Sequence, residues 1–99
     1  MQKYIMQMYN INGEKMDIEE YRNRIDLLDE QITKLITERF ETACEIGLYK
    51  KENGIGITDS GREEDVIKKV RSLSDKYSDE CEAVYREIIS QSKKIQSEK

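Results

Sequence analysis

The sequence predicts an all-α fold of three helices, one very long and two shorter, which intertwine with a second copy in a two-fold homodimer. Three observations support this fold class. The chain has 99 residues, no proline and 38% charged residues, a composition that suits long helices with solvated faces. Apolar residues recur at alternating spacings of three and four from residue 18 onward, which is the period of a helix packed along one seam. Residues 52–58 form the one internal segment with a convincing loop composition.

The first helix is predicted to begin near Asp17, whose carboxylate can cap it, with Glu20 three residues later as the capping partner. Nothing breaks the pattern before Asn53-Gly54, which gives about 35 residues and ~50 Å of helix. Because Gly47 costs about 1 kcal/mol relative to alanine inside a helix, we expect it to mark close helix packing rather than a break. The apolar seam comprises Ile18, Tyr21, Ile25, Leu28, Ile32 and Leu35, then Ile46 and Tyr49.

Two shorter helices are predicted to follow. The second starts at Asp59 or Ser60, where Ser60-Gly-Arg-Glu63 has the pattern of a capping box. The third runs from about Asp79 to the end of the chain, and its seam becomes polar partway along. The apolar face of the second helix comprises Val66, Ile67, Val70 and Leu73, and the seam of the third comprises Cys81, Tyr85, Ile88, Ser92 and Ile95, with Gln96 one turn beyond Ser92.

The length of the first helix is the reason to expect a dimer. Helices of about 15 and 19 residues cannot cover a stripe of ~50 Å, so roughly half of it would face water in a monomer. We therefore expect the long helix to pair with its own copy around a two-fold axis. From periodicity alone, a purely structural dimeric coiled coil is the favoured interpretation.

Composition argues against several classes of function. The chain has no histidine, the commonest general base and metal ligand, and we predict neither a metal nor another cofactor. A net charge of −4 without a basic face argues against nucleic acid as a partner. No apolar run reaches membrane-spanning length, and the N-terminus lacks the apolar stretch of a signal peptide. Cys44 and Cys81 form no CxxC pair and are expected to be reduced, in a cytoplasmic protein.

The chain is predicted to form one domain over residues 17–99, preceded by an N-terminal extension, residues 1–16. That extension fits no strong period and carries the turn pair Asn12-Gly13. Its role is left open between an ordered arm, a disordered tail and an upstream start before Met16.

Two cations on the first helix point toward its packed side. Arg39 occupies a seam position where an apolar residue is due. Lys50 lies eleven residues further on, rotated by only about 20° around the helix. A charge on a packed seam is costly unless an anion meets it, and this stripe offers no obvious acid. The sequence therefore predicts a pocket for an anion.

With these inward polar residues, the sequence resembles the all-α class of chorismate mutases, small dimeric enzymes of aromatic amino-acid biosynthesis. The resemblance extends from about Asp17 to Gln96, and the extra residues in front and the glycine-rich loop depart from it. Five motifs carry it in order: Tyr21-Arg-Asn-Arg-Ile-Asp-Leu-Leu-Asp-Glu30, Glu38-Arg39, Gly47-Leu-Tyr-Lys50, Asp59-Ser-Gly-Arg-Glu63 and Ile88-Ile-Ser-Gln-Ser92-Lys-Lys-Ile-Gln96.

The resemblance implies a site for chorismate, residue by residue. Arg39 and Arg22 would bind the two carboxylates of the substrate. Lys50 would contact a carboxylate and the ether oxygen of the breaking C–O bond, and Gln96 would donate to that same oxygen. Glu63, with the backbone around Asp59, would bind the ring hydroxyl of the substrate. Arg62 and Ser92 would complete the wall of the pocket.

Helix geometry places a condition on Arg22. It precedes Arg39 by 17 residues, which is ~25 Å along one helix. A ligand roughly 10 Å across cannot touch both side chains on the same rigid helix. If Arg22 belongs to the site, it must come from the other protomer of the dimer.

Each site residue also has an ordinary structural explanation. Arg39 can snorkel from a seam, the helix dipole favours Lys50 near a C-terminus, and caps and surface pairs account for the others. Three other functions therefore stay open. They are isochorismate pyruvate-lyase, which shares the fold, a sensor of chorismate or prephenate without turnover, and a structural dimerisation module.

Overall fold

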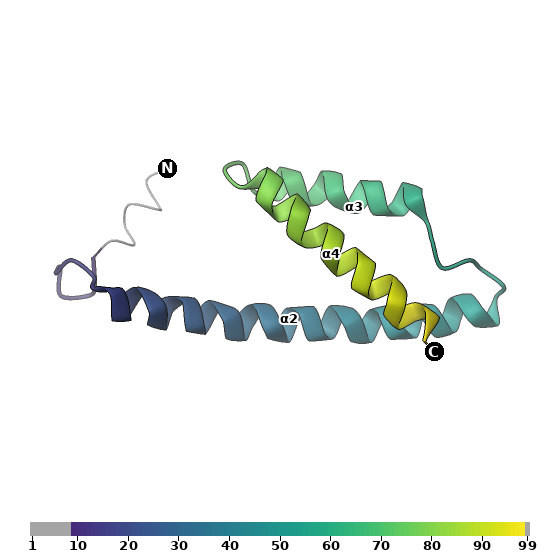
Figure 1. The fold of residues 1–99 in the computed structure, drawn as a ribbon, viewed down its shortest axis with the longest axis horizontal. Helices are drawn as coiled ribbons and strands as arrows, with labels where there is room; N and C mark the ends of the chain where they lie inside the picture. Colours follow the sequence, from purple (N-terminus) through teal and green to yellow (C-terminus); the bar gives the residue numbers. More distant parts are fainter. Residues whose placement is uncertain (1–8, 99) are drawn as a thin grey trace. The chain divides into compact units, whose positions relative to one another are not determined.

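A computed structural model describes residues 9–98 and contains three helices in that range (Figure 1). They are α2, Ile18–Glu52, then α3, Ser60–Leu73, and α4, Ser78–Ser97. Residues 9–98 form no strand beyond an isolated antiparallel bridge between Tyr9 and Lys15. The predicted all-α class and its three helices are confirmed, with ends within about two residues of those expected. No helix in this range is long and apolar enough to cross a membrane.

The chain divides into two compact units within α2, between Ile36 and Thr37. The first unit contains the start of α2 and the residues before it. The second contains the end of α2 together with α3 and α4, and it holds most of the residues proposed for the site. The predicted division between an extension and a domain at residue 17 stays a prediction, and residues 1–8 of that extension lie outside the described range.

The start of α2 is fixed by a reciprocal cap. The backbone N–H of Glu20 donates to Asp17 Oδ1 at 2.9 Å, and the backbone N–H of Asp17 donates to Glu20 Oε1 at 3.2 Å. This is the predicted capping box, and it satisfies two N–H groups that the helix itself cannot. Before it, Asn10 Oδ1 accepts from the backbone N–H groups of Asn12 and Glu14, and Asn10 Nδ2 donates to Glu20 Oε2. A side-chain network therefore ties the turn at residues 10–14 to the first turn of α2.

The sequence let the second helix start at Asp59 or Ser60, and the structure decides between the two. Asp59, not Ser60, is the N-cap of α3, because its Oδ1 accepts from the backbone N–H of Arg62 at 3.0 Å. A carboxylate at the N-cap also interacts favourably with the helix dipole, and Ser60 becomes the first helical residue. The predicted Ser60–Glu63 capping box is therefore wrong. It leaves the Glu63 carboxylate free for another role.

The core of the second unit is small. Its most buried apolar residues are Ala43 on α2, Ile67 and Val70 on α3, and Ile88 on α4. Leu73, expected on the apolar face of α3, is 75% exposed in the single chain, so it adds nothing to this core. It is the last residue of α3, directly before Ser74, which takes an extended backbone.

A chain of ion pairs joins α3 to the start of α4. Arg71 contacts Asp79 at 2.9 Å and Glu82 at 2.7 Å, and Arg86 contacts Glu82 at 2.8 Å and Glu64 at 3.5 Å. Hydrogen bonds from Arg86 and then from Arg71 lower the pKa of Glu82. Glu82 therefore keeps its charge at neutral pH, and its pair with Arg71 ties α3 to α4 near the connection at residues 74–77.

The apolar seam at the start of α2 is exposed in the single chain. Between 45% and 66% of the surface of each of its aliphatic members is accessible to water, namely Ile18, Ile25, Leu28, Ile32 and Leu35. Regularly spaced aliphatic side chains of this kind are what an interaction face presents.

Candidate functional site

Arg39 is held by two neutral groups of α4. Its Nη1 donates to Ser92 Oγ at 2.8 Å, and its guanidinium carbon lies 5.5 Å from the centroid of the Tyr85 ring. Ser92 is only 5% exposed, and its hydroxyl donates to the backbone oxygen of Ile88 at 2.8 Å. Because the single hydroxyl proton goes to Ile88, Ser92 presents a lone pair to Arg39. The cation is thus placed by a hydroxyl acceptor and an aromatic face.

Lys50 is held in the same way near the end of α2. Its Nζ donates to the backbone oxygen of Ile57 at 2.8 Å and to Gln96 Oε1 at 3.0 Å. An ammonium group has three protons and no acceptor, so two of its donors are used here. The contact also fixes the Gln96 amide, because only its oxygen can face Lys50. The amide NH₂ can then donate to another acceptor.

Neither half-buried cation has an acidic partner. Within residues 9–98, no carboxylate forms an ion pair with Arg39 or Lys50. Their partners on α4, Ser92 and Gln96, are neutral. Two positive charges that lack counter-ions and are partly removed from water favour a negatively charged ligand.

The predicted residues of α3 lie apart from this hydrogen-bond network. Asp59 and Arg62 are exposed, and in the described residues neither bonds to the two cations. Glu63 is half-buried and forms an ion pair with Lys93 of α4 at 3.3 Å. The structure therefore brings the α2 and α4 site residues together in pairs, and it links Glu63 to α4 through Lys93.

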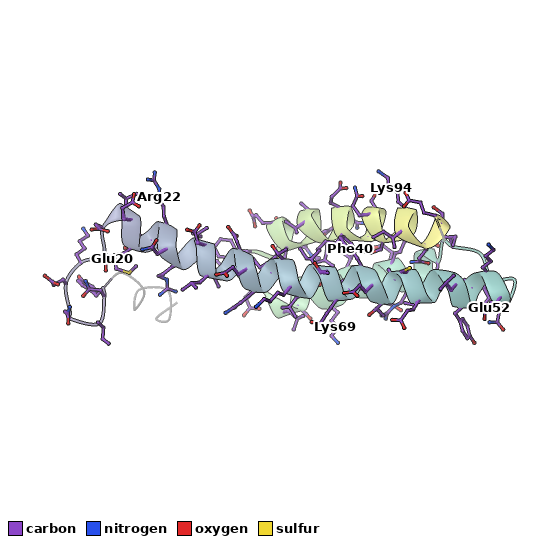
Figure 2. All side chains as sticks on the ribbon, turned by 90° about the horizontal axis from the view of Figure 1, so that it is seen from below. Glu20, Arg22, Phe40, Glu52, Lys69 and Lys94 are labelled. Atoms are coloured by element: carbon purple, nitrogen blue, oxygen red, sulfur yellow. The ribbon has the colours of Figure 1, made fainter. Side chains whose placement is uncertain are left out.

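Arg22 belongs to the first unit. It is exposed and forms an ion pair with Glu19, one turn earlier on α2, at 3.1 Å. Figure 2 shows its side chain extending away from the helix. This is the surface pairing that the sequence also allowed, and the role of Arg22 in a site stays a prediction.

The structure adds three residues to the site that the sequence analysis did not assign to it, namely Ile57, Tyr85 and Lys93. The oxygen of Ile57 acts through the backbone, which no residue type reveals. Tyr85 was assigned to the apolar seam, which hides its contact with the Arg39 cation. Lys93 follows Ser92 in a charged stretch near the C-terminus, where a lysine gives no signal. Of these, only Tyr85 had a usable clue, because it lies about two turns before Ser92 on the same side of α4.

Comparison with known proteins identifies the family of this chain. The family model for chorismate mutase type II matches residues 21–97. A chorismate mutase of Methanocaldococcus jannaschii is 39% identical over 54 residues, which are 54% of this chain and 54% of that protein. The match thus spans about half the length of that relative. No solved structure matches the chain. The family resemblance seen in the sequence is confirmed: because the family model covers well over half of its length, this chain belongs to the type II chorismate mutase family.

Proposed function

We propose that this protein rearranges chorismate to prephenate, in aromatic amino-acid biosynthesis, in a cationic pocket built around Arg39 and Lys50. The observation that carries the proposal is the pair of half-buried cations without a carboxylate partner in the described residues, each held by a neutral group of α4. A dicarboxylate substrate supplies the negative charge that this arrangement lacks.

The reaction matches the side chains that are available. It is a one-step pericyclic shift of bonds that needs no nucleophile and no proton relay. The reaction can therefore proceed in a site that has no histidine. The protein has to hold the dianion in its compact, reactive conformer. It also has to place hydrogen-bond donors where negative charge develops, on the ether oxygen of the stretching C–O bond.

The proposed roles follow from the donors. The planar fork of Arg39 binds a carboxylate. Lys50 and the amide NH₂ of Gln96 donate to the ether oxygen. Ser92 orients Arg39, through the bond at 2.8 Å.

The ring hydroxyl is assigned to the α3 side of the pocket. Glu63 accepts it, with the backbone around Asp59, and Arg62 completes the wall. The pair between Glu63 and Lys93 at 3.3 Å supports this assignment, because it holds the carboxylate of α3 against α4, the helix that carries Ser92 and Gln96.

The second carboxylate is assigned to Arg22 of a second copy. The support is the exposed seam of α2, whose aliphatic side chains are 45–66% accessible in the single chain. Pairing of two long helices buries these side chains and brings the Arg22 of one copy toward the pocket of the other. We therefore propose an intertwined two-fold homodimer as the active form.

The dimer gives a direct prediction. We expect no stable folded monomer, because a separated chain would leave the α2 seam in water. Light scattering at micromolar concentration is expected to give twice the 11.7 kDa chain mass, with helical circular dichroism lost on dilution to the monomer. A compact 11.7 kDa species with full helical signal would contradict the proposed assembly.

A spectrophotometric assay of chorismate consumption, with product identification, tests the function. Prephenate as the product supports the mutase. If the protein bound chorismate without turnover, it would be a sensor. If it bound no small dianion, it would be a structural dimerisation module. The same assay with isochorismate separates the lyase, because that reaction releases pyruvate.

The neutral amide of Gln96 leads to a pH prediction. Since Gln96 needs no proton to donate, the rate of the native protein is expected to be about the same at pH 5 and pH 8. A Gln96→Glu variant can donate only when its carboxyl is protonated, so it is expected to work only at low pH. Rates at pH 5 and pH 8 check this. If the Gln96→Glu variant were equally active at both pH values, Gln96 would not be a donor to the ether oxygen.

A further inference from the structure

Gly47 lies where α2 meets the backbone of α4. It is buried, and a Cβ atom built on it would stand 2.7 Å from both the Cα and the carbonyl oxygen of Gln96. Separations below 3.0 Å essentially never occur for real Cβ atoms, and a helix backbone cannot step aside as a flexible side chain can. The close helix packing predicted at Gly47 is thus confirmed, and its neighbour is a residue of the proposed site.

The position of Gly47 couples this contact to Lys50. The two residues lie three apart on α2, so they occupy neighbouring places on one face of the helix. Gln96 therefore rests its backbone on Gly47 and receives the Lys50 ammonium on its amide oxygen at 3.0 Å. Both contacts depend on how close α4 comes to α2 at this point.

From this arrangement we infer that Gly47 is a positioning residue of the proposed mutase reaction, one that sets the place of the Gln96 amide relative to Lys50. This inference rests on the proposed function and adds a residue that itself touches no substrate. The absence of a side chain, rather than an unusual backbone conformation, is what the site uses, because Gly47 has no positive φ.

The size of the effect follows from the distances. To bring a Cβ from 2.7 Å to the ordinary contact limit of 3.4 Å, the backbone of Gln96 must withdraw by 0.7 Å. The same withdrawal along the Lys50–Gln96 hydrogen bond, now 3.0 Å, takes it beyond hydrogen-bond length. Misplacement on the order of 1 Å costs a reaction up to about a hundredfold in rate.

Gly47→Ala is therefore expected to lower kcat by about ten- to a hundredfold, with a smaller change in KM. The split is expected because the amide acts on the charge that develops in the transition state, while the Arg39–Ser92 pair one turn away still binds a carboxylate. Gly56→Ala is the matched control. The same exchange there adds a methyl group to open space, and kcat is expected to stay within about twofold of the native value.

A double mutant separates positioning from general damage. If Gly47 acts through the amide, Gly47→Ala in a Gln96→Ala background has nothing left to misplace and is expected to change kcat by less than about threefold. Gln96→Asn, which retracts the amide by one methylene without touching Gly47, is expected to give a loss like that of Gly47→Ala. Circular dichroism and thermal unfolding accompany each variant.

Each outcome has a defined meaning. Full activity of Gly47→Ala, the same fold-loss in both backgrounds, or a Gly47→Ala protein that does not fold would overturn the positioning role. An inactive native protein would overturn the proposed function and this inference with it. If the native protein and the Gly56→Ala variant both turn over chorismate, the proposed function stands. Any of the three results for Gly47→Ala would then overturn only the inference about Gly47.

Discussion

Replacing Lys50 with alanine is expected to lower kcat by at least ~10²-fold while the protein stays folded. Loss of one charge-stabilising donor usually has an effect of this size, and Lys50 is the proposed donor to the ether oxygen with a full positive charge. Folding is expected to survive because the change removes one of two cations that have no acidic partner in the described residues. It also leaves the Ile57 and Gln96 oxygens in a part of the structure that water can reach.

Lys51→Ala is the matched control for this variant. It removes the same charge one residue further on, from a side chain that is exposed at the same helix end. We expect its kcat to stay near the native value, as exposed substitutions usually do. Steady-state kinetics and circular dichroism decide the matter. A Lys50→Ala protein within a few-fold of native activity, or a Lys51→Ala protein that is equally inactive, would rule out the role assigned to Lys50.

A mixture of two inactive variants is expected to regain about a quarter of native activity if the pocket is shared between copies. Arg22→Ala and Lys50→Ala each inactivate their homodimers, since every site then lacks one cation. In a mixed dimer, one site combines the intact Lys50 of the first chain with the intact Arg22 of the second, and the other site carries both lesions. Random pairing after unfolding and refolding makes half of the dimers mixed, so about a quarter of all sites are native in composition.

The control is a second mixture, Arg39→Ala with Lys50→Ala. Both of these residues lie on α2 of the same chain and are assigned to the same pocket, so no mixed dimer contains an intact site and no activity is expected to return. Native mass spectrometry verifies that mixed dimers form in both mixtures. If the first mixture stayed inactive with mixed dimers present, Arg22 would not reach the pocket of its partner.

The helices of this protein could be predicted because their signals are local. Asp17 and Glu20 lie in one turn, and their reciprocal bonds need nothing beyond that turn. Gly47 was interpretable because a glycine inside a long helix needs a reason, and the reason found is the Gln96 backbone. The error at Ser60 arose between adjacent candidate caps, where Asp59 offers the stronger acceptor.

The cations of the site and the polar breaks in the seam of α4 were predictable from the sequence, but their pairing was not. Arg39 and Ser92 each interrupt an apolar repeat, and nothing within either helix says that the two side chains meet. The pairing of Glu63 with Lys93 depends on how α3 meets α4, which no spacing within one helix determines. The contribution of Arg22 depends on a second copy, and so it remains a prediction.

The hydrogen bond from Lys50 to the backbone oxygen of Ile57 bears on where residues can be inserted into this chain. Connections between helices ordinarily absorb insertions and deletions with little effect. Here the carbonyl of Ile57 accepts from the Lys50 ammonium at 2.8 Å, so a change of length in this segment acts on a residue of the proposed site. We therefore expect the turn at residues 74–77 to be the better place to graft a tag or a foreign loop.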